Sequence, residues 1–164
     1  MEIERKYAIR NMPEDLSGYE KKIIEQGYLC HNPTVRIRKS NEEYILTYKS
    51  KLGVDPITQS HSNVNHEVEL PLTEEAYLKL KAKTDGNMIY KTRYLIPLPN
   101  GLTAELDVFE GVLKGLVFAE VEFPDILSAE EFVPPAWFGR NLSPDKSFTN
   151  YHLSLCSLPP VIDL

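Results

Sequence analysis

The 164-residue sequence has only two cysteines, Cys30 and Cys156, which lie far apart and lack the spacing of metal ligands or of a disulfide framework. So little cysteine is typical of a reduced, cytoplasmic protein rather than of a secreted scaffold. No apolar run approaches the ~20 residues that a membrane-spanning helix needs. The start, Met1-Glu2-Ile3-Glu4, has neither the basic nor the apolar segment of a signal peptide. We therefore predict a cytoplasmic protein without a membrane partner.

The chain also lacks an excess of basic residues, because its net charge is −6. This balance argues against a general nucleic-acid partner, although 18 lysines and arginines are enough for a local basic pocket. The sequence has no glycine-rich phosphate loop and suggests no Ser/His/Asp set, and its four histidines lie in loop-like or terminal positions. Length and an ordinary hydrophobic fraction of 42% predict a single domain over residues 1–164 with a substantial core.

What the sequence has in abundance is charged residues at alternating positions, with mostly apolar residues between them. The pattern occurs in Glu2-x-Glu4-x-Lys6, Arg36-x-Arg38, Lys49-x-Lys51, Glu67-x-Glu69, Lys91-x-Arg93, Glu105-x-Asp107 and Glu120-x-Glu122. Residues i and i+2 of a β-strand share a face, so each group points to one side and its apolar neighbours to the other. The apolar side must be buried, and the charged side must face water or a polar interior.

The predicted elements are mostly strands joined by short turns. We expect strands over 1–9, 26–30, 34–39, 44–51, 66–71, 90–98, 102–110 and 116–123. We expect helices over 13–26, from Thr73 to about 83, after a capping box at Ser128, and over 150–158, with 52–65 as a loop. The helices do not alternate regularly with the strands, which argues against a doubly wound parallel sheet. The predicted fold is α+β: a closed, eight-stranded antiparallel β-barrel with flanking helices.

For any single strand, the charged face has a simpler explanation as the solvated side of a half-buried sheet. The complete set argues otherwise, because nearly every mid-strand position of this face carries a full charge. The signs also separate: Arg36, Arg38, Lys49 and Lys51 fall on one predicted hairpin, and Glu105, Asp107, Glu120 and Glu122 on another. We therefore expect like charges to face each other across these hairpins, which costs energy unless a ligand of opposite charge binds.

The charges indicate what such a ligand would be. Clustered Arg and Lys suit phosphate oxygens, and clustered carboxylates suit Mg²⁺ or Mn²⁺. A metal–polyphosphate complex satisfies both sets at once, and phosphoryl transfer needs mainly positioning and charge neutralisation.

These residues also match a known family. Glu2-Ile3-Glu4-Arg5-Lys6 resembles the ExExK signature of CYTH domain proteins, the triphosphate tunnel metalloenzymes. The resemblance continues in order through Gln26-Gly27-Tyr28-Leu29, Val35-Arg36-Ile37-Arg38, Lys49-Ser50-Lys51, Glu67-Val68-Glu69, Lys91-Thr92-Arg93-Tyr94, Glu105-Leu106-Asp107-Val108-Phe109 and Glu120-Val121-Glu122-Phe123. ExExK alone is a weak pattern, whereas the ordered set over nearly the whole chain is specific.

The resemblance implies an eight-stranded barrel forming a tunnel that holds a triphosphate and Mg²⁺ or Mn²⁺. By position it assigns phosphate contacts to Lys6, Arg36, Arg38, Lys49, Lys91 and Arg93, to which we add Lys51 from the charge pattern. It assigns the metal to Glu2, Glu4, Glu105, Asp107, Glu120 and Glu122, with Glu67 and Glu69 as a further acidic pair. It also suggests Tyr28 as a proton acceptor. Lys6 is the rival for that role, and Tyr28 could instead be a packing aromatic.

The family contains inorganic and thiamine triphosphatases, RNA triphosphatases and class IV adenylate cyclases. The small bacterial branch that this chain resembles is most like the inorganic triphosphatases. We expect hydrolysis of inorganic triphosphate to pyrophosphate and phosphate, with a nucleoside or thiamine triphosphatase or a cyclase as alternatives. A non-catalytic polyphosphate- or nucleotide-binding module is the alternative outside the enzymes. A homodimer stays open, because the sequence gives no direct sign of oligomerisation.

Overall fold

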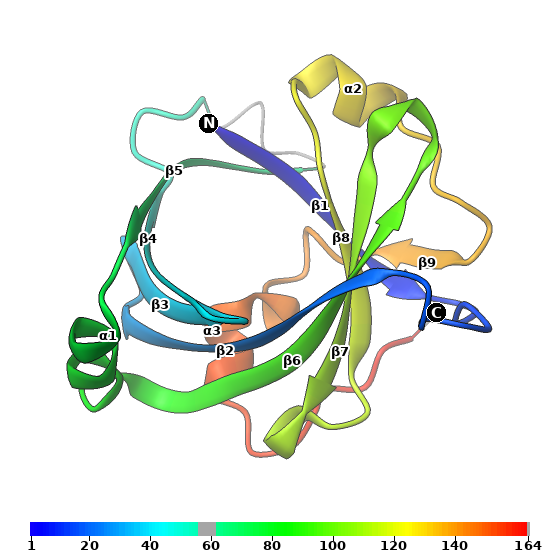
Figure 1. The fold of residues 1–164 in the computed structure, drawn as a ribbon. Coiled ribbons are helices and arrows are strands. Elements are labelled where there is room, and N and C mark those ends of the chain that lie inside the picture. Colours follow the sequence, from blue (N-terminus) through cyan, green and yellow to red (C-terminus); the bar gives the residue numbers. More distant parts are fainter. Residues whose placement is uncertain (56–61, 164) are drawn as a thin grey trace.

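The fold is a strongly curved antiparallel sheet that closes on itself, as seen in a computed structural model that describes residues 1–55 and 62–163 (Figure 1). Its strands are β1 (Glu2–Ile9), β2 (Glu20–Cys30), β3 (Thr34–Ser40), β4 (Glu43–Ser50), β5 (Asn63–Pro71), β6 (Asp85–Pro97), β7 (Thr103–Glu110), β8 (Val117–Glu122) and β9 (Phe138–Asn141). The helices are α1 (Glu74–Lys81), α2 (Ile126–Glu131) and α3 (Asn150–Ser154), with short 3₁₀ turns at Pro99–Gly101, Gly111–Leu113 and Lys146–Phe148.

Pairing of the first strand with the fifth closes the barrel. The strand order is β5-β4-β3-β2-β6-β7-β8-β1, and β1 also pairs with β5 through Glu2–Asn65, Ile3–Val64 and Glu4–Asn63. The eight-stranded barrel predicted from the sequence is therefore confirmed. A ninth strand, β9, which the sequence analysis did not predict, pairs with the far half of β1 on the outside of the ring.

Alternation along the strands produces two separate apolar clusters. The first packs the outer faces of β1, β6, β7 and β8 beneath α2 and β9, and includes Tyr7, Leu106, Val121, Phe123 and Phe138. The second cluster fills one end of the barrel interior. Inward side chains of β2, β6, β7 and β8 pack there against α3 and the 3₁₀ turn at Lys146–Phe148. The cluster includes Tyr28, Ile89, Phe109, Phe118 and Leu153. This second cluster, named here the apolar floor, leaves the rest of the interior to charged side chains.

The predicted helix over 13–26 is wrong. Leu16, Tyr19, Ile23 and Ile24 have helical spacing, yet residues 20–30 form the long strand β2, bonded to β3 on one side and β6 on the other. Two ladders of backbone hydrogen bonds and an inward-facing row of side chains outweigh a weak local helical preference.

Smaller differences concern where the other elements begin and end. Thr73 caps α1 as expected, through Ala76 N, but Asp125, not Ser128, caps α2, because its side chain accepts from Ser128 N. The last helix ends at Ser154 rather than at 158. Residues 63–65 of the predicted loop 52–65 belong to β5, where they close the barrel, and residues 56–61 of that loop lie outside the described residues.

Candidate functional site

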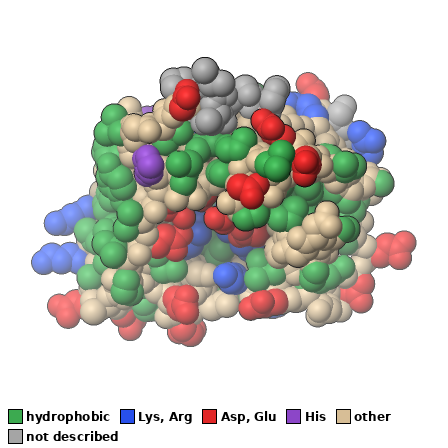
Figure 2. Space-filling view, turned by 90° about the horizontal axis from the view of Figure 1, so that it is seen from above, with side chains coloured by type: hydrophobic (Ala, Val, Ile, Leu, Met, Phe, Trp, Pro, Cys, Tyr) green, Lys and Arg blue, Asp and Glu red, His purple; other side chains and the backbone are tan. Residues whose placement is uncertain are grey.

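The barrel interior holds a cavity of about 190 Å³ whose wall is almost entirely charged. It is lined by Glu2, Glu4, Lys22, Ile24, Arg36, Arg38, Ser40, Glu43, Ile45, Lys49, Glu67, Glu69, Arg93, Glu105, Glu120, Glu122 and Asn150. Figure 2 shows acidic and basic side chains gathered in a hollow. Among the described residues, only Ile24 and Ile45 contribute apolar side chains to this wall, so the cavity suits a small, highly charged ligand.

Most of the site residues predicted from the sequence line this cavity, but five do not: Lys6, Tyr28, Lys51, Lys91 and Asp107. Four lining residues with polar or charged side chains were missed, namely Lys22, Ser40, Glu43 and Asn150. Lys22 carried a usable signal, because it shares the alternation of Ile24 and Gln26 and would have been found had β2 been predicted in full. Asn150 lies on α3, outside the strand pattern, and had no such signal.

One wall of the cavity is an ion-pair network on β6 and β7. Arg93 donates from Nε to Asp107 Oδ1 at 2.7 Å and from Nη2 to Oδ2 at 2.9 Å. Lys91 Nζ donates to the same Oδ2 at 2.7 Å, and the Lys91 and Asp107 side chains are both fully buried. Burial alone would raise the pKa of Asp107, but Arg93 and Lys91 outweigh it and hold the pKa below its usual value. Both oxygens of this carboxylate are thus occupied by cations.

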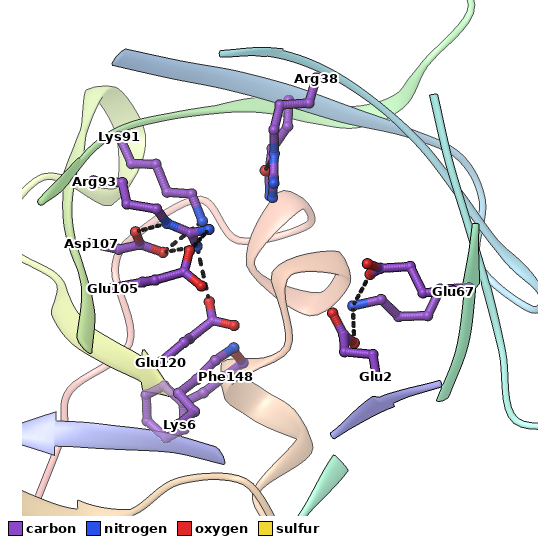
Figure 3. Close-up of polar contacts among 12 residues, drawn as sticks. Glu2, Lys6, Arg38, Glu67, Lys91, Arg93, Glu105, Asp107, Glu120 and Phe148 are labelled. Carbon is purple, nitrogen blue, oxygen red and sulfur yellow. Dashed lines mark hydrogen bonds and ion pairs between the residues drawn. The ribbon is translucent and has the colours of Figure 1, made fainter. Parts of the chain in front are cut away.

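The same arginine reaches two further carboxylates. Arg93 bonds Glu105 through Nη1 and lies 3.4 Å from Glu120 Oε1 through Nη2 (Figure 3). Burial would raise the pKa of Glu120, but Lys6 and Arg93 outweigh it and depress this pKa well below its usual range. Arg93 is therefore surrounded by negative charge before any ligand arrives.

A second, smaller network lies on the opposite side of the cavity. Lys49 Nζ is 2.9 Å from Glu2 Oε1 and 3.4 Å from Glu67 Oε2. Figure 3 shows Glu2 and Glu67 on one side of the interior, with the Arg93 network on the other.

Arg36 and Arg38 of β3 differ from these cations, because neither forms an ion pair with any residue in the described ranges. Arg38 projects into the space between the two networks (Figure 3), and its Nε donates to the amide of Gln26 at 2.9 Å. Burial, with the like charges of Arg36 and Arg93, lowers the pKa of Arg38 to about 10, so it remains cationic at neutral pH. Arg36 is buried, bonds Thr47 Oγ1 at 3.3 Å, and its Nε has no partner among the described residues. These two guanidinium groups are available for an anion.

Three carboxyl groups in the wall have more negative than positive charge around them or are deeply buried, and their pKa values are raised. Burial, followed by the nearby Glu120 carboxylate, raises the pKa of Glu4 well above its usual range. Burial also raises the pKa of Glu2, against the effect of Lys49, and burial together with Glu2 and Glu105 raises that of Glu122. Carboxylates crowded in this way are stabilised by an added cation.

The two residues considered for proton transfer lie at the apolar floor. Lys6 Nζ donates to the carbonyl oxygen of Phe148 at 2.6 Å and lies 4.4 Å from the centre of the Phe118 ring. Tyr28 is buried, packs edge-on against Tyr151, and raises the pKa of Arg36 against the opposing effect of burial. Lys51 lies just beyond β4, where its Nζ donates to the Val64 carbonyl at 3.4 Å.

The prediction that like charges face each other across the basic hairpin is wrong. Arg36 pairs in register with Thr47, and Arg38 with Ile45. Opposite signs face each other at Lys49–Glu67, Arg93–Asp107 and Lys6–Glu120. On the acidic hairpin, Glu105 does face Glu120, but Asp107 faces Phe118, so this half of the prediction is confirmed for one pair only. A further like-charge pair, Glu4–Glu122, lies between β1 and β8. The sequence could not settle this point, because a shift of one residue in register changes every partner.

The donor set also shows how far the site suits a metal. Within the described residues, no three acidic or imidazole side chains form a ready metal centre. The carboxylates of Glu2, Glu4, Glu120 and Glu122 nevertheless supply only hard oxygen ligands, and three of them have raised pKa values that a bound cation would reverse. Their chemistry fits Mg²⁺ or Mn²⁺, provided that the side chains converge on binding.

This combination of a closed antiparallel barrel and a charged interior defines a family. The CYTH domain family model matches residues 1–144, and the chain belongs to that family. It is 37% identical over 163 residues to an inorganic triphosphatase of Nitrosomonas europaea, covering 96% of this chain and 99% of the relative. It is 31% identical over 156 residues to an inorganic triphosphatase of Acetivibrio thermocellus, covering 93% and 92%.

Solved structures agree on the fold. The crystal structure of an inorganic triphosphatase superimposes with a TM-score of 0.67 and 33% identity, covering 98% of this chain and 97% of the other. No helix in the described part of this protein has the length and apolar character needed to cross a membrane.

Proposed function

We propose that this protein hydrolyses inorganic triphosphate to pyrophosphate and phosphate in the charged cavity of the barrel, with Mg²⁺ or Mn²⁺ as cofactor. The observation that carries this proposal is the presence of two cations, Arg36 and Arg38, that have no acidic partner among the described residues. They lie between walls in which Lys49 and Arg93 are already paired. Two relatives named inorganic triphosphatases align with 96% and 93% of this chain, which supports the same substrate.

The residues then divide the work by charge. Arg36 and Arg38 bind phosphate oxygens directly, because guanidinium groups form paired, charge-assisted hydrogen bonds with them. Lys49 and Arg93 add positive charge from the two networks, and binding redistributes their contacts with carboxylates. Lys6, Lys51 and Lys91 remain proposed contributors to phosphate binding, with Lys6 and Lys91 acting from behind the wall.

Glu2, Glu4, Glu120 and Glu122 would hold the metal, which supplies charge neutralisation and Lewis acidity when bound. Glu105 and Asp107 belong to the proposed acidic set but hold Arg93, and Glu67 holds Lys49. Glu69 lines the wall without an assigned partner role. Proton transfer is proposed for Tyr28, which lies opposite Arg36 in the pairing of β2 with β3, or for Lys6, which lies opposite Glu120 in the pairing of β1 with β8. Both side chains reach the apolar floor.

The lining favours an inorganic substrate over a nucleotide or thiamine triphosphate. An organic group needs apolar or aromatic contacts, and Ile24 and Ile45 are the only apolar side chains among the described lining residues. An assay of phosphate release from inorganic triphosphate, ATP and thiamine triphosphate, each with and without Mg²⁺ or Mn²⁺, tests the proposal. We expect metal-dependent release from inorganic triphosphate above all. Binding of triphosphate without any release would instead indicate a non-catalytic binding module.

A further inference from the structure

Gln26 lies on the inward face of β2, directly opposite Arg38 on β3, and is fully buried. Its Oε1 accepts the Nε hydrogen bond of Arg38 at 2.9 Å. The amide oxygen must be the atom that faces Arg38, because the nitrogens of an arginine only donate. The Gln26 Nε2 has no hydrogen-bond partner among the described residues, although it is buried.

Arg93 shows what a different acceptor does in the same barrel. Its Nε is also held from a neighbouring strand, but by the Asp107 carboxylate at 2.7 Å, with Glu105 and Glu120 on its other nitrogens. Both arginines are therefore fixed through Nε. The charge of Arg93 is balanced by acids, whereas the acceptor of Arg38 is neutral.

The neutral acceptor has a cost in the absence of a ligand. Burial, together with the like charges of Arg36 and Arg93, lowers the pKa of Arg38. A carboxylate at position 26 would relieve this repulsion, since charge-assisted pairs are stronger than bonds to an amide. A bound anion would also relieve this repulsion. The neutral amide of Gln26 therefore leaves the positive charge of Arg38 uncompensated until a ligand binds.

We propose that Gln26 is a positioning residue for substrate binding, which fixes the Arg38 guanidinium through Nε and leaves its two terminal nitrogens and its full charge for a phosphate group. This role rests on the proposed function, because the phosphate belongs to the triphosphate substrate. It explains why an uncharged side chain occupies a fully buried place among the cations of the barrel. Preorganised donors of this kind bind without paying for rearrangement when the ligand arrives.

The test is calorimetric binding of inorganic triphosphate to the full chain in metal-free buffer, at several ionic strengths. Gln26→Glu keeps the acceptor and its shape but adds a charge, and Gln26→Met keeps the approximate length but removes the acceptor. Ile23→Glu is the matched control, because it adds the same charge to β2 on the outward face, where Ile23 is 55% exposed. Thermal unfolding of each variant reports its fold separately.

We expect Gln26→Glu to weaken binding roughly tenfold or more, with a shallower dependence on ionic strength and an unfolding temperature no lower than that of the unchanged protein. Gln26→Met should weaken binding several-fold with an unchanged salt dependence, and Ile23→Glu should bind normally. Binding by both Gln26 variants within about twofold of the unchanged protein would overturn the positioning role. If the folded, unchanged protein bound no triphosphate either in metal-free buffer or with Mg²⁺ or Mn²⁺ added, the proposed function itself would be overturned, and this role with it.

Discussion

Asp107 and Arg93 face each other across β7 and β6, and the guanidinium binds both oxygens of the carboxylate, at 2.7 and 2.9 Å. Lys91 adds a third bond, to Oδ2. A carboxylate held in this way orients Arg93 but offers a metal no free oxygen. The sequence placed Asp107 in the metal set, and its contacts favour a role in holding the cations.

Asp107→Asn should therefore act on stability and substrate binding rather than on the metal. Removing one partner of a buried ion pair leaves Arg93 and Lys91 partly uncompensated, so we expect a loss of about 3 kcal/mol in the free energy of unfolding. The KM for triphosphate should rise, while the Mg²⁺ concentration for half-maximal activity stays the same. Urea unfolding and metal titration measure both effects, with the exposed Asp163→Asn as control. A raised metal requirement would return Asp107 to the metal ligands.

Glu4→Gln should affect the metal requirement and turnover rather than the stability of the fold. Glu4 lines the cavity, and burial beside Glu120 raises its pKa, as expected of a group that awaits a cation. We expect turnover to fall about 10–100-fold and the metal requirement to rise, while the fold survives. Steady-state kinetics over a range of Mg²⁺ and Mn²⁺ concentrations gives both values, and the exposed Glu42→Gln provides the control. Turnover equal to that of the unchanged protein would remove Glu4 from the metal set.

Arg38→Ala tests the proposal that Arg36 and Arg38 bind phosphate. Loss of a charge-assisted contact should weaken triphosphate binding by about 1.5–3 kcal/mol, seen chiefly in KM. Lys39→Ala is the matched control, since Lys39 is the next residue of β3 and points to the outer face, over the Tyr44 ring. Equal KM values for the two variants would contradict the assignment of Arg38.

Tyr28→Phe separates packing from proton transfer. Tyr28 is buried at the apolar floor beside Arg36, so loss of the hydroxyl alone should preserve the fold and raise KM through Arg36. Wild-type turnover would exclude the phenol as a base and favour Lys6. A fall in kcat of about 10²-fold or more with unchanged KM would instead establish the proton role.

The contact of α1 with the barrel should depend on pH. Tyr77 donates from its hydroxyl to Glu25 Oε1 at 2.7 Å, and Lys81 Nζ lies 3.1 Å from the same oxygen. Burial opposes ionisation of Glu25, but Tyr77 and Lys81 outweigh it and lower the pKa below 4.5. A carboxyl with a depressed pKa stabilises the fold above its unfolded pKa and loses that contribution as pH falls through the folded value.

Tyr77→Phe should therefore cost about 1 kcal/mol of unfolding free energy at pH 7, where Glu25 is ionised. The difference between variant and unchanged protein should shrink below about pH 4.5, as the carboxyl becomes protonated. Urea unfolding at pH 7 and at more acidic values measures it, with Tyr48→Phe on the exposed outer face as control. A difference that does not change with pH would assign the effect to packing.

Several features of the barrel could be predicted from local pattern alone. The alternation in β1, β3, β7 and β8 put Glu4, Arg36, Glu105 and Glu120 on one face, because strand geometry fixes which residues share a side. The same reasoning failed for β2. The spacing of Leu16, Tyr19 and Ile23 fits a helix. Only pairing with β3 and with β6, which is distant in the sequence, makes residues 20–30 a strand.

The sequence by itself thus determined which side chains face inward in β1, β3, β7 and β8 and, through their charges, the kind of ligand that the interior suits. Tertiary structure alone decided which of those charges are already paired. Arg93 meets Asp107 and Arg38 meets Gln26 because of strand register and barrel closure. Register depends on hydrogen-bond ladders between segments far apart in the chain, and one residue of slip would exchange every partner. The difference between Arg93, whose charge is balanced by acids, and Arg38, whose acceptor is neutral, is for that reason a property of the folded barrel.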